Sequence, residues 1–374
     1  MASAKKDILM SLIFAVLCAA IFMLPSAERE SEGTKERAVV LSVDNANIMS
    51  VGLLKQGEQK LEVEVQSGKF KGEKFAAMNV LRAQMDLDKI FEAGDEALVG
   101  IPHGATPQGT TINAQDHYRT GWTFALLGIF ALLLFAYAGA IGVKAVLSFV
   151  FSCAVIWKIV VPLCLRGASP IAVCLGAVCV LSAAIIFLVG GLTRKGFAAF
   201  AGTVSGVLAS CITGWIFAGL FKINGAVMPY SQALLYSGYE FLSLPDIYIG
   251  AIFLSSSGAV MDLSMDVAAG MDELLRRNPN LSRKKLMESG FRIGRVVVGT
   301  MTTTLLLAYS GGYLTLMMTF SAQGVSPTDF INNPYVASEC VKTLVGSFGL
   351  VLVAPFTAIA GAFILKADAR GSGA

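Results

Sequence analysis

Long apolar segments recur along most of the chain, and short polar connections separate them. Each is about 17 to 25 residues long, the length of helix that crosses a hydrocarbon layer of about 30 Å. Because backbone polar groups in lipid must be satisfied within the segment, we expect each to form a helix. The segments lie near 8–24, 121–140, 145–165, 170–191, 197–221, 246–265, 294–320 and 341–365. The pattern predicts an α-helical polytopic membrane protein with about eight transmembrane helices.

One long polar stretch, residues 26–120, interrupts this pattern. Within it Leu61, Val63 and Val65 alternate with glutamates, a period of two that is typical of a half-buried strand, and the run 38–43 has the same character. We therefore expect a small, mostly β extracytoplasmic domain between helices 1 and 2, with its linker at 102–118. The predicted domains are an N-terminal anchor (1–25), the β-rich domain and linker (26–120), a seven-helix membrane domain (121–365) and a tail (366–374). A cleaved signal peptide is the alternative for the first segment.

Positive charge predicts the orientation. If the amino terminus is inside, fourteen lysines and arginines fall on the inner side, and the short outer connections hold only Arg166, Lys222 and Lys342. Both termini are thus predicted to be cytoplasmic, in a bacterial cytoplasmic membrane. The outer connections 222–245 and 321–340 are long and partly apolar, so interfacial or re-entrant segments are both open there.

Composition removes several classes of function. Hydrophobic residues make up 55% of the chain and charged residues 15%, and the net charge is only +3, without a basic stripe that would bind nucleic acid. The sequence has no phosphate-binding loop and no His-Glu-x-x-His, so we expect no cofactor, and an intramembrane enzyme is a minority hypothesis. The seven cysteines are interpreted as packing residues, and whether a metal binds stays open.

Polar residues inside the apolar segments are the candidate functional residues. Helical spacing places Ser255, Gly258, Asp262 and Asp266 on one stripe of the sixth segment. A carboxylate at membrane depth must face a partner, a cation or water, so Asp262 is the first candidate for handling an ion or a proton. The alternative is that both aspartates are ordinary helix-end residues in the headgroup zone, and Asp266 fits that description better.

Three further groups extend the set of candidates. Thr300 and Thr303 of the seventh segment offer oxygen ligands, or else hydroxyls that pack helices together. Glu339 and Lys342 are three residues apart and can pair, as an interface anchor or as part of a gate. Lys158, inside the third segment, needs a counter-ion or must extend toward the outer surface.

Three runs in the later segments form recognisable motifs: 258–262 (Gly-Ala-Val-Met-Asp), 294–302 with its Gly-Arg and Gly-Thr-Met-Thr, and 346–349 (Gly-Ser-Phe-Gly). In these runs the chain resembles the YibE/F-like membrane proteins of bacteria. The resemblance extends over roughly residues 35–365 and implies a multi-pass protein with one early extracytoplasmic domain. The family pattern has asparagine at the position of Thr303 and serine at that of Asp266, which weakens both as candidates.

Two functional hypotheses follow. The first is a secondary transporter or permease for a small solute or ion, in which Asp262 handles charge. The second is a non-transporting membrane scaffold whose extracytoplasmic domain binds an envelope protein. The lipid bilayer is a partner in both, and the sequence does not decide the oligomeric state.

Overall fold

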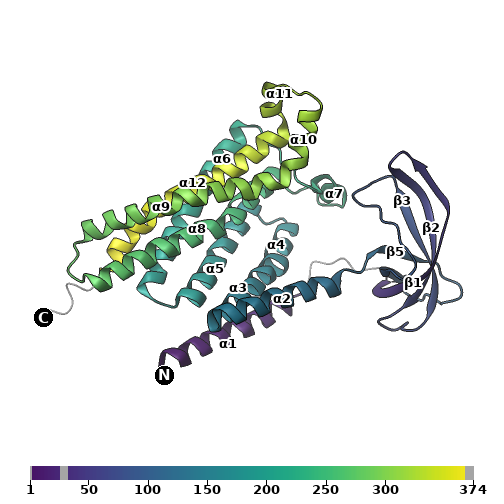
Figure 1. Cartoon of the computed structure of the whole chain (residues 1–374), viewed down its shortest axis with the longest axis horizontal. Coiled ribbons are helices and arrows are strands. Elements are labelled where there is room, and N and C mark those ends of the chain that lie inside the picture. The colour runs from purple at the N-terminus through teal and green to yellow at the C-terminus, as the bar shows by residue number, and fades with distance from the viewer. Residues whose placement is uncertain (1, 26–32, 367–374) are drawn as a thin grey trace. The chain divides into compact units, whose positions relative to one another are not determined.

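The structure is a computed structural model that describes residues 2–25 and 33–366. The chain divides into two compact units (Figure 1). One is Glu28–Leu133, and the other joins Met1–Ala27 to Leu134–Ala374. Each unit is described by itself below.

The smaller unit contains a closed five-stranded barrel. Its strands are β1 (Gly33–Val51), β2 (Leu54–Val65), β3 (Lys74–Arg82), β4 (Glu96–Pro102) and β5 (Ile112–His117). Around the barrel they follow the order β1-β2-β3-β5-β4, and every neighbouring pair is antiparallel except β3 and β5. This is the arrangement of an OB-fold, a small Greek-key barrel.

The interior of the barrel explains its sequence pattern. Leu61, Val63 and Val65 of β2 are buried, whereas the glutamates between them are not, which confirms the period of two. A buried amide pair lies among these apolar residues: Asn79 Nδ2 donates to Gln59 Oε1 at 3.0 Å, and Gln59 Nε2 donates to the Phe91 carbonyl at 2.8 Å. These bonds fix the segment between β3 and β4 to the barrel.

Seven described helices or helical runs are long and apolar enough to cross a membrane, and no further span of that length is found in the described part of the chain. The structure thus supports a membrane-embedded protein. The remaining expected segment, the first at 8–24, coincides with α1 (Ala2–Phe22), of which Ser11–Phe22 is a shorter apolar helix. The seven are Thr120–Ala138 (α2), Ala140–Leu165 (α3, η1 and α4), Pro170–Gly190 (α5), Arg194–Leu220 (α6), Leu244–Arg277 (α8), Arg283–Ala322 (α9, η2 and α10) and Pro334–Ile364 (α12).

Several helices extend well beyond the apolar segments that predict them. The segment expected at 246–265 is part of the 34-residue helix α8, which is about 51 Å long at 1.5 Å per residue. Helix α9 begins at Arg283, where the Ser282 hydroxyl accepts a hydrogen bond from the Lys285 amide at 3.3 Å. The predicted segments were shorter than the helices because they were defined by hydropathy, whereas the ends of these helices carry charged residues.

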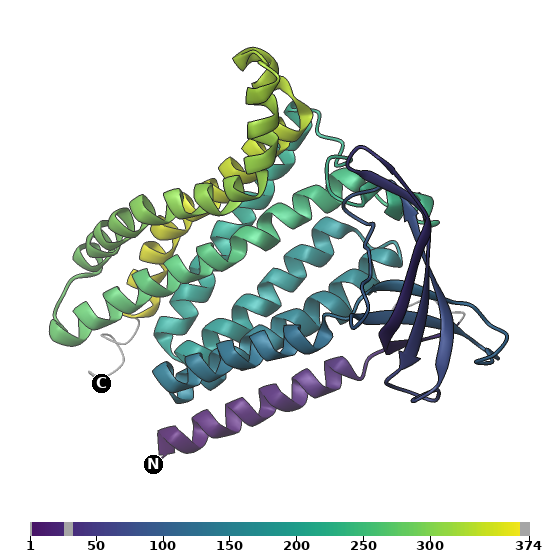
Figure 2. The same ribbon diagram turned by 45° about the vertical axis from the view of Figure 1, so that its right-hand side comes forward.

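The membrane unit is built around α8, which packs against α5, α6, α9 and α12 (Figure 2). Glycines allow close contact between α6 and α12: Gly202 lies against Thr357, and Gly206 lies against Val353 and Val260. The sequence pattern Gly-x-x-x-Gly therefore marks helix packing here. Between α6 and α8, the hydroxyls of Thr203 and Ser264 are buried and lie 2.5 Å apart.

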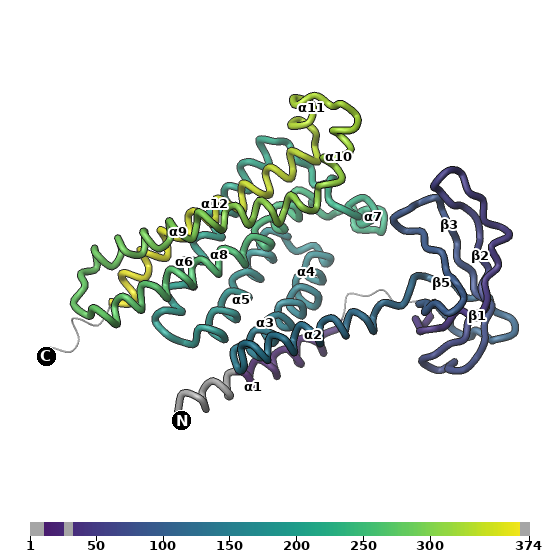
Figure 3. Tube along the Cα trace, viewed as in Figure 1, coloured from purple at the N-terminus to yellow at the C-terminus, as the bar shows by residue number. Residues whose placement is uncertain are grey.

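Two long helical runs change their winding, and the helices that flank both changes, α3 and α4, and α9 and α10, are labelled on the Cα trace (Figure 3). A π-helical turn, η1 (Ile156–Val160), lies between α3 (Ala140–Val155) and α4 (Val161–Leu165). A 3-10 turn, η2 (Gly311–Tyr313), follows α9 (Arg283–Ser310) and precedes α10 (Leu314–Ala322), and it begins with two adjacent glycines. The long connections contain short helices, α7 (Ser231–Tyr236) and α11 (Pro327–Asn332).

Candidate functional site

A stripe of small and acidic residues runs along the otherwise well-buried helix α8. Its members are exposed and recur at intervals of three and four residues, the spacing of one helix face. We call it the α8 stripe; it comprises Ala251, Ser255, Gly258, Asp262, Asp266, Ala269 and Glu273. The sequence prediction that Ser255, Gly258, Asp262 and Asp266 share one face is confirmed.

Helices α5 and α9 flank the α8 stripe on opposite sides. On one side Met265 packs against Gly190 of α5. On the other side Ile293 of α9 packs against Gly270, and the hydroxyls of Ser255 and Tyr309 lie 3.2 Å apart. The stripe is therefore the open face between two neighbouring helices.

These contacts also fix the register of α8 and α9. The two helices are antiparallel, because Ser255 meets Tyr309 whereas Gly270 meets Ile293. Asp262 is thus level with residues 300–302 of α9. Its carboxylate interacts electrostatically with that of Asp266, one turn away.

The predicted site residues Thr300, Thr303 and Lys158 lie outside the α8 stripe. Thr300 and Thr303 are exposed on α9, and the Thr300 hydroxyl donates to the Val297 carbonyl at 3.0 Å. In the described residues, no hydrogen bond joins either threonine to Asp262. The structure therefore places the threonines near the height of Asp262 along α9, and it does not show that they bind a ligand together with Asp262. Lys158 is half-buried in η1, which packs against α5, and it is not part of the α8 stripe.

A second polar cluster connects α12, α9 and α8. Glu339 Oε1 and Lys342 Nζ lie 3.5 Å apart, so the two residues pair as their spacing allows. The Lys342 ammonium lies 5.0 Å from the centre of the Tyr309 ring, in cation–π geometry. Tyr309 in turn meets Ser255 of the α8 stripe, so this cluster reaches one end of the stripe.

Sequence reasoning missed the tyrosines that organise this cluster. Tyr309 lies beside α12 at Gly346, where a Cβ atom would lie 3.7 Å from the tyrosine ring, an ordinary contact distance. Tyr248 of α8 is buried and donates to the Ser338 carbonyl at 2.5 Å. The available signal was a phenolic hydroxyl inside an apolar segment, which must find a hydrogen-bonding partner.

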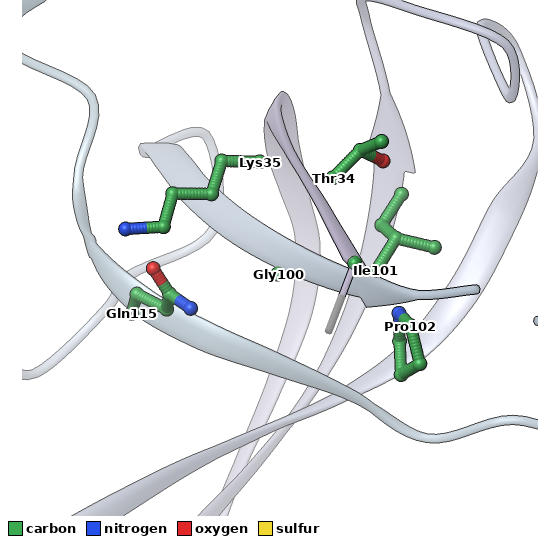
Figure 4. A pocket seen from close by; sticks show the side chains of 7 residues that line it. Thr34, Lys35, Gly100, Ile101, Pro102 and Gln115 are labelled. Atoms are coloured by element: carbon green, nitrogen blue, oxygen red, sulfur yellow. The ribbon is translucent and has the colours of Figure 1, made fainter. Parts of the chain in front are cut away.

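The barrel has a separate surface pocket of about 250 Å³ where β1, β4 and β5 meet. The amine of Lys35 and the side-chain amide of Gln115 lie along it beside Ile101 and Pro102 (Figure 4). Gln115 covers Gly100, where a side chain would collide with its amide. The pocket is shallow and carries a single charged group.

Comparison with known proteins gives a match to a protein family. The model of the family described as "YibE/F-like protein" matches residues 126–367, well over half of the chain. The chain belongs to the YibE/F-like family. The match covers the α8 stripe, α9 and the Glu339 cluster of this YibE/F-like protein, but not its barrel. No curated protein and no solved structure gives a significant match.

The part of this YibE/F-like protein that the structure describes contains no evident metal site. Within residues 2–25 and 33–366, no three histidine, cysteine, aspartate or glutamate side chains lie close enough together to hold an ion. Asp262 and Asp266 form a pair rather than a cage. Such a pair can attract a passing cation or exchange a proton.

Proposed function

We propose that this protein is a secondary transporter or permease for a small solute or ion, and that the α8 stripe is its path. Asp262 handles the charge, and Asp266 assists it from the next turn. Thr300 contributes at the edge of the path, at the level of Asp262. A cation, or a solute coupled to protons, suits a path with this charge.

One observation carries the proposal: the carboxylates of Asp262 and Asp266 are exposed on the open face of α8, the most enclosed of the described spans. A carboxylate that faced lipid would cost free energy and would stabilise nothing. Water or a cation that reaches that face would offset this cost, because it would solvate or pair with the carboxylate. The small members of the stripe, Ala251, Gly258 and Ala269, leave room beside α8 for such a species.

The test is flux into proteoliposomes that hold the full-length protein. Protons, Na⁺ and Mg²⁺ are supplied in turn, and entry is followed with an internal pH dye or by ion measurement. We expect flux of at least one ion through the wild type. Asp262→Asn and Asp262→Ala should reduce it about tenfold or more, since each removes the charge on which the path depends.

Glu288→Gln is the matched control, because Glu288 is an exposed carboxylate of α9 outside the α8 stripe. It should leave flux unchanged. If the two Asp262 variants carry wild-type flux while remaining folded, the assigned role of Asp262 is wrong. If flux of all three ions equals that of empty liposomes, transport of these ions is excluded.

A feature of the barrel favours the second candidate, a non-transporting scaffold that binds an envelope protein. The tip of the β1–β2 hairpin exposes a cluster of apolar side chains: Met49 is 68% exposed, Val51 72% and Leu53 85%. Such a patch is typical of an interaction surface. Residues 26–120 are extracytoplasmic in this proposal, so the tip would meet proteins outside the membrane.

The scaffold hypothesis makes separate predictions. Replacing Met49 and Leu53 by serine should abolish crosslinking to the envelope partner in cells and should leave membrane insertion intact. Asp262 variants should then act only through stability. A wild type that transports an ion, with flux unchanged by the two serine substitutions, would favour the transporter instead.

A further inference from the structure

A pocket of about 280 Å³ lies where α9, η2, α10, α11 and α12 meet. Its walls are mostly apolar: Leu306 of α9, Leu316 of α10, Phe330 of α11 and Leu344 of α12 line it. Phe320 and Phe330 pack edge to face, with ring centres 5.8 Å apart, and hold α10 against α11. The pocket is separate from the α8 stripe and has no role in the proposed transport path.

One acidic residue, Glu339, stands in this apolar wall. Its Oε1 atom faces Lys342 at 3.5 Å, and the Tyr313 hydroxyl interacts with the carboxylate by a side-chain hydrogen bond as well as electrostatically. Its Oε2 atom is buried and has no hydrogen-bond partner in the described residues. A buried carboxylate oxygen without a donor is costly, so a ligand that supplies one would gain binding energy at this point.

The charges around Glu339 favour an uncharged donor. Lys342 already neutralises the carboxylate, so a second ammonium would bring two cations to one anion. A second carboxylate would be repelled by the first. A hydroxyl group donates one hydrogen bond without adding charge, and the apolar walls suit an aliphatic body.

We propose that this pocket binds a neutral amphiphile, whose hydroxyl headgroup donates to Glu339 Oε2 and whose hydrocarbon body packs between α10 and α12. The α8 stripe, with its exposed carboxylates, is not suited to bind a ligand of this class. The site is independent of the transport path.

The experiment uses the full-length protein in phosphatidylcholine nanodiscs and a photoreactive diazirine analogue of decan-1-ol. After illumination, the labelled residues are mapped by mass spectrometry. We expect saturable labelling within Leu314–Ala322 and Pro334–Ile364. Excess decan-1-ol should suppress it, whereas decanoate and decylamine, the anionic and cationic matches of the same length, should compete at least about tenfold less well.

Two variants test the two parts of the site. Glu339→Leu removes the acceptor and should weaken saturable labelling about tenfold, which corresponds to about 1.4 kcal/mol. Met317→Trp keeps Glu339 but fills the pocket, and should abolish labelling even if Glu339→Leu does not fold. Thr315→Val is the control, because Thr315 is an exposed residue of α10 that does not line the pocket.

Several results would overturn the proposal. Labelling that does not saturate, or that Met317→Trp leaves unchanged, means that the probe only partitions into lipid. Stronger competition by decylamine would show that the pocket takes a cation instead of a hydroxyl. Asp262→Asn should leave labelling at the wild-type level, so this result is independent of whether the chain transports ions.

Discussion

The contact between α6 and α12 at Gly206 permits a quantitative prediction. A methyl group built on Gly206 would lie 2.8 Å from Cβ of Val353 and 3.0 Å from Cγ1 of Val260. Both distances are too short for carbon atoms in contact, and both neighbours are short branched side chains on other helices. Gly206→Ala must therefore push α6 away from α12 and α8.

Gly219 provides the matched control on the same helix. No atom lies within 4 Å of a methyl group built at that position. Replacing glycine by alanine raises helix propensity by about 1 kcal/mol in a helix interior, as at Gly206, and by less at Gly219 in the last turn of α6. The difference between the two variants is therefore a lower bound on the packing cost, which is about 1–3 kcal/mol for an extra methyl group in a well-packed core.

The assay is unfolding of the full-length protein in mixed micelles with a rising fraction of dodecyl sulfate, followed by tryptophan fluorescence. Trp215 lies on α6 and reports on this helix. We expect Gly219→Ala to be neutral or slightly stabilising, and Gly206→Ala to unfold at a lower fraction of dodecyl sulfate. Equal midpoints for the two variants would refute the close approach of α6 to α12.

Two other predictions concern hydrogen bonds. In a double-mutant cycle, Thr203→Val and Ser264→Ala should show a coupling of about 0.6 kcal/mol, the average for side-chain hydrogen bonds between membrane helices. Additive effects would argue against the 2.5 Å contact. In the barrel, hydrogen bonds from the backbone of Arg82 and Gln84 hold the pKa of Asp88 below its usual value, against a smaller opposing effect of burial. The stabilisation that Asp88 provides should be complete above the ordinary carboxyl pKa and should be lost as pH falls through the lower folded-state value. Hydrogen exchange at the amides of Arg82 and Gln84 measures it, and Asp88→Asn should remove the pH dependence.

Local patterns predicted the elements well. The alternation at Leu61, Val63 and Val65 located a real strand, because one face of a barrel strand must be buried whatever its neighbours are. The apolar segments located the helices for a similar reason, since a lipid-spanning segment must satisfy its own backbone. The polar ends of α8 and α9 were missed because there propensity and capping, rather than hydropathy, decide where a helix stops.

The candidate site was predictable only in part. The α8 stripe follows from helical spacing alone, so Ser255 and Asp262 could be placed on one face from the sequence. The contact of Ser255 with Tyr309 depends on the packing of α8 against α9, and no local pattern specifies that packing. The pocket beside Glu339 could not be predicted from the sequence, because five separate elements form its walls.

The π-helical turn η1 sets the phase of the third span. A π-turn holds one residue more than the α-turn it replaces, so side chains after it are rotated by about 100° relative to an uninterrupted helix. Phe151, before the turn, and Pro162, after it, are both buried. Eleven positions separate them, which is about three turns of a regular α-helix, so without the π-turn both would lie on one face. With the extra residue in the turn, the two buried side chains lie on faces that differ by roughly 80°. Regular α-helical winding of the same residues would turn one half of the span away from its packing partners, so the winding of this segment is as constrained as its composition.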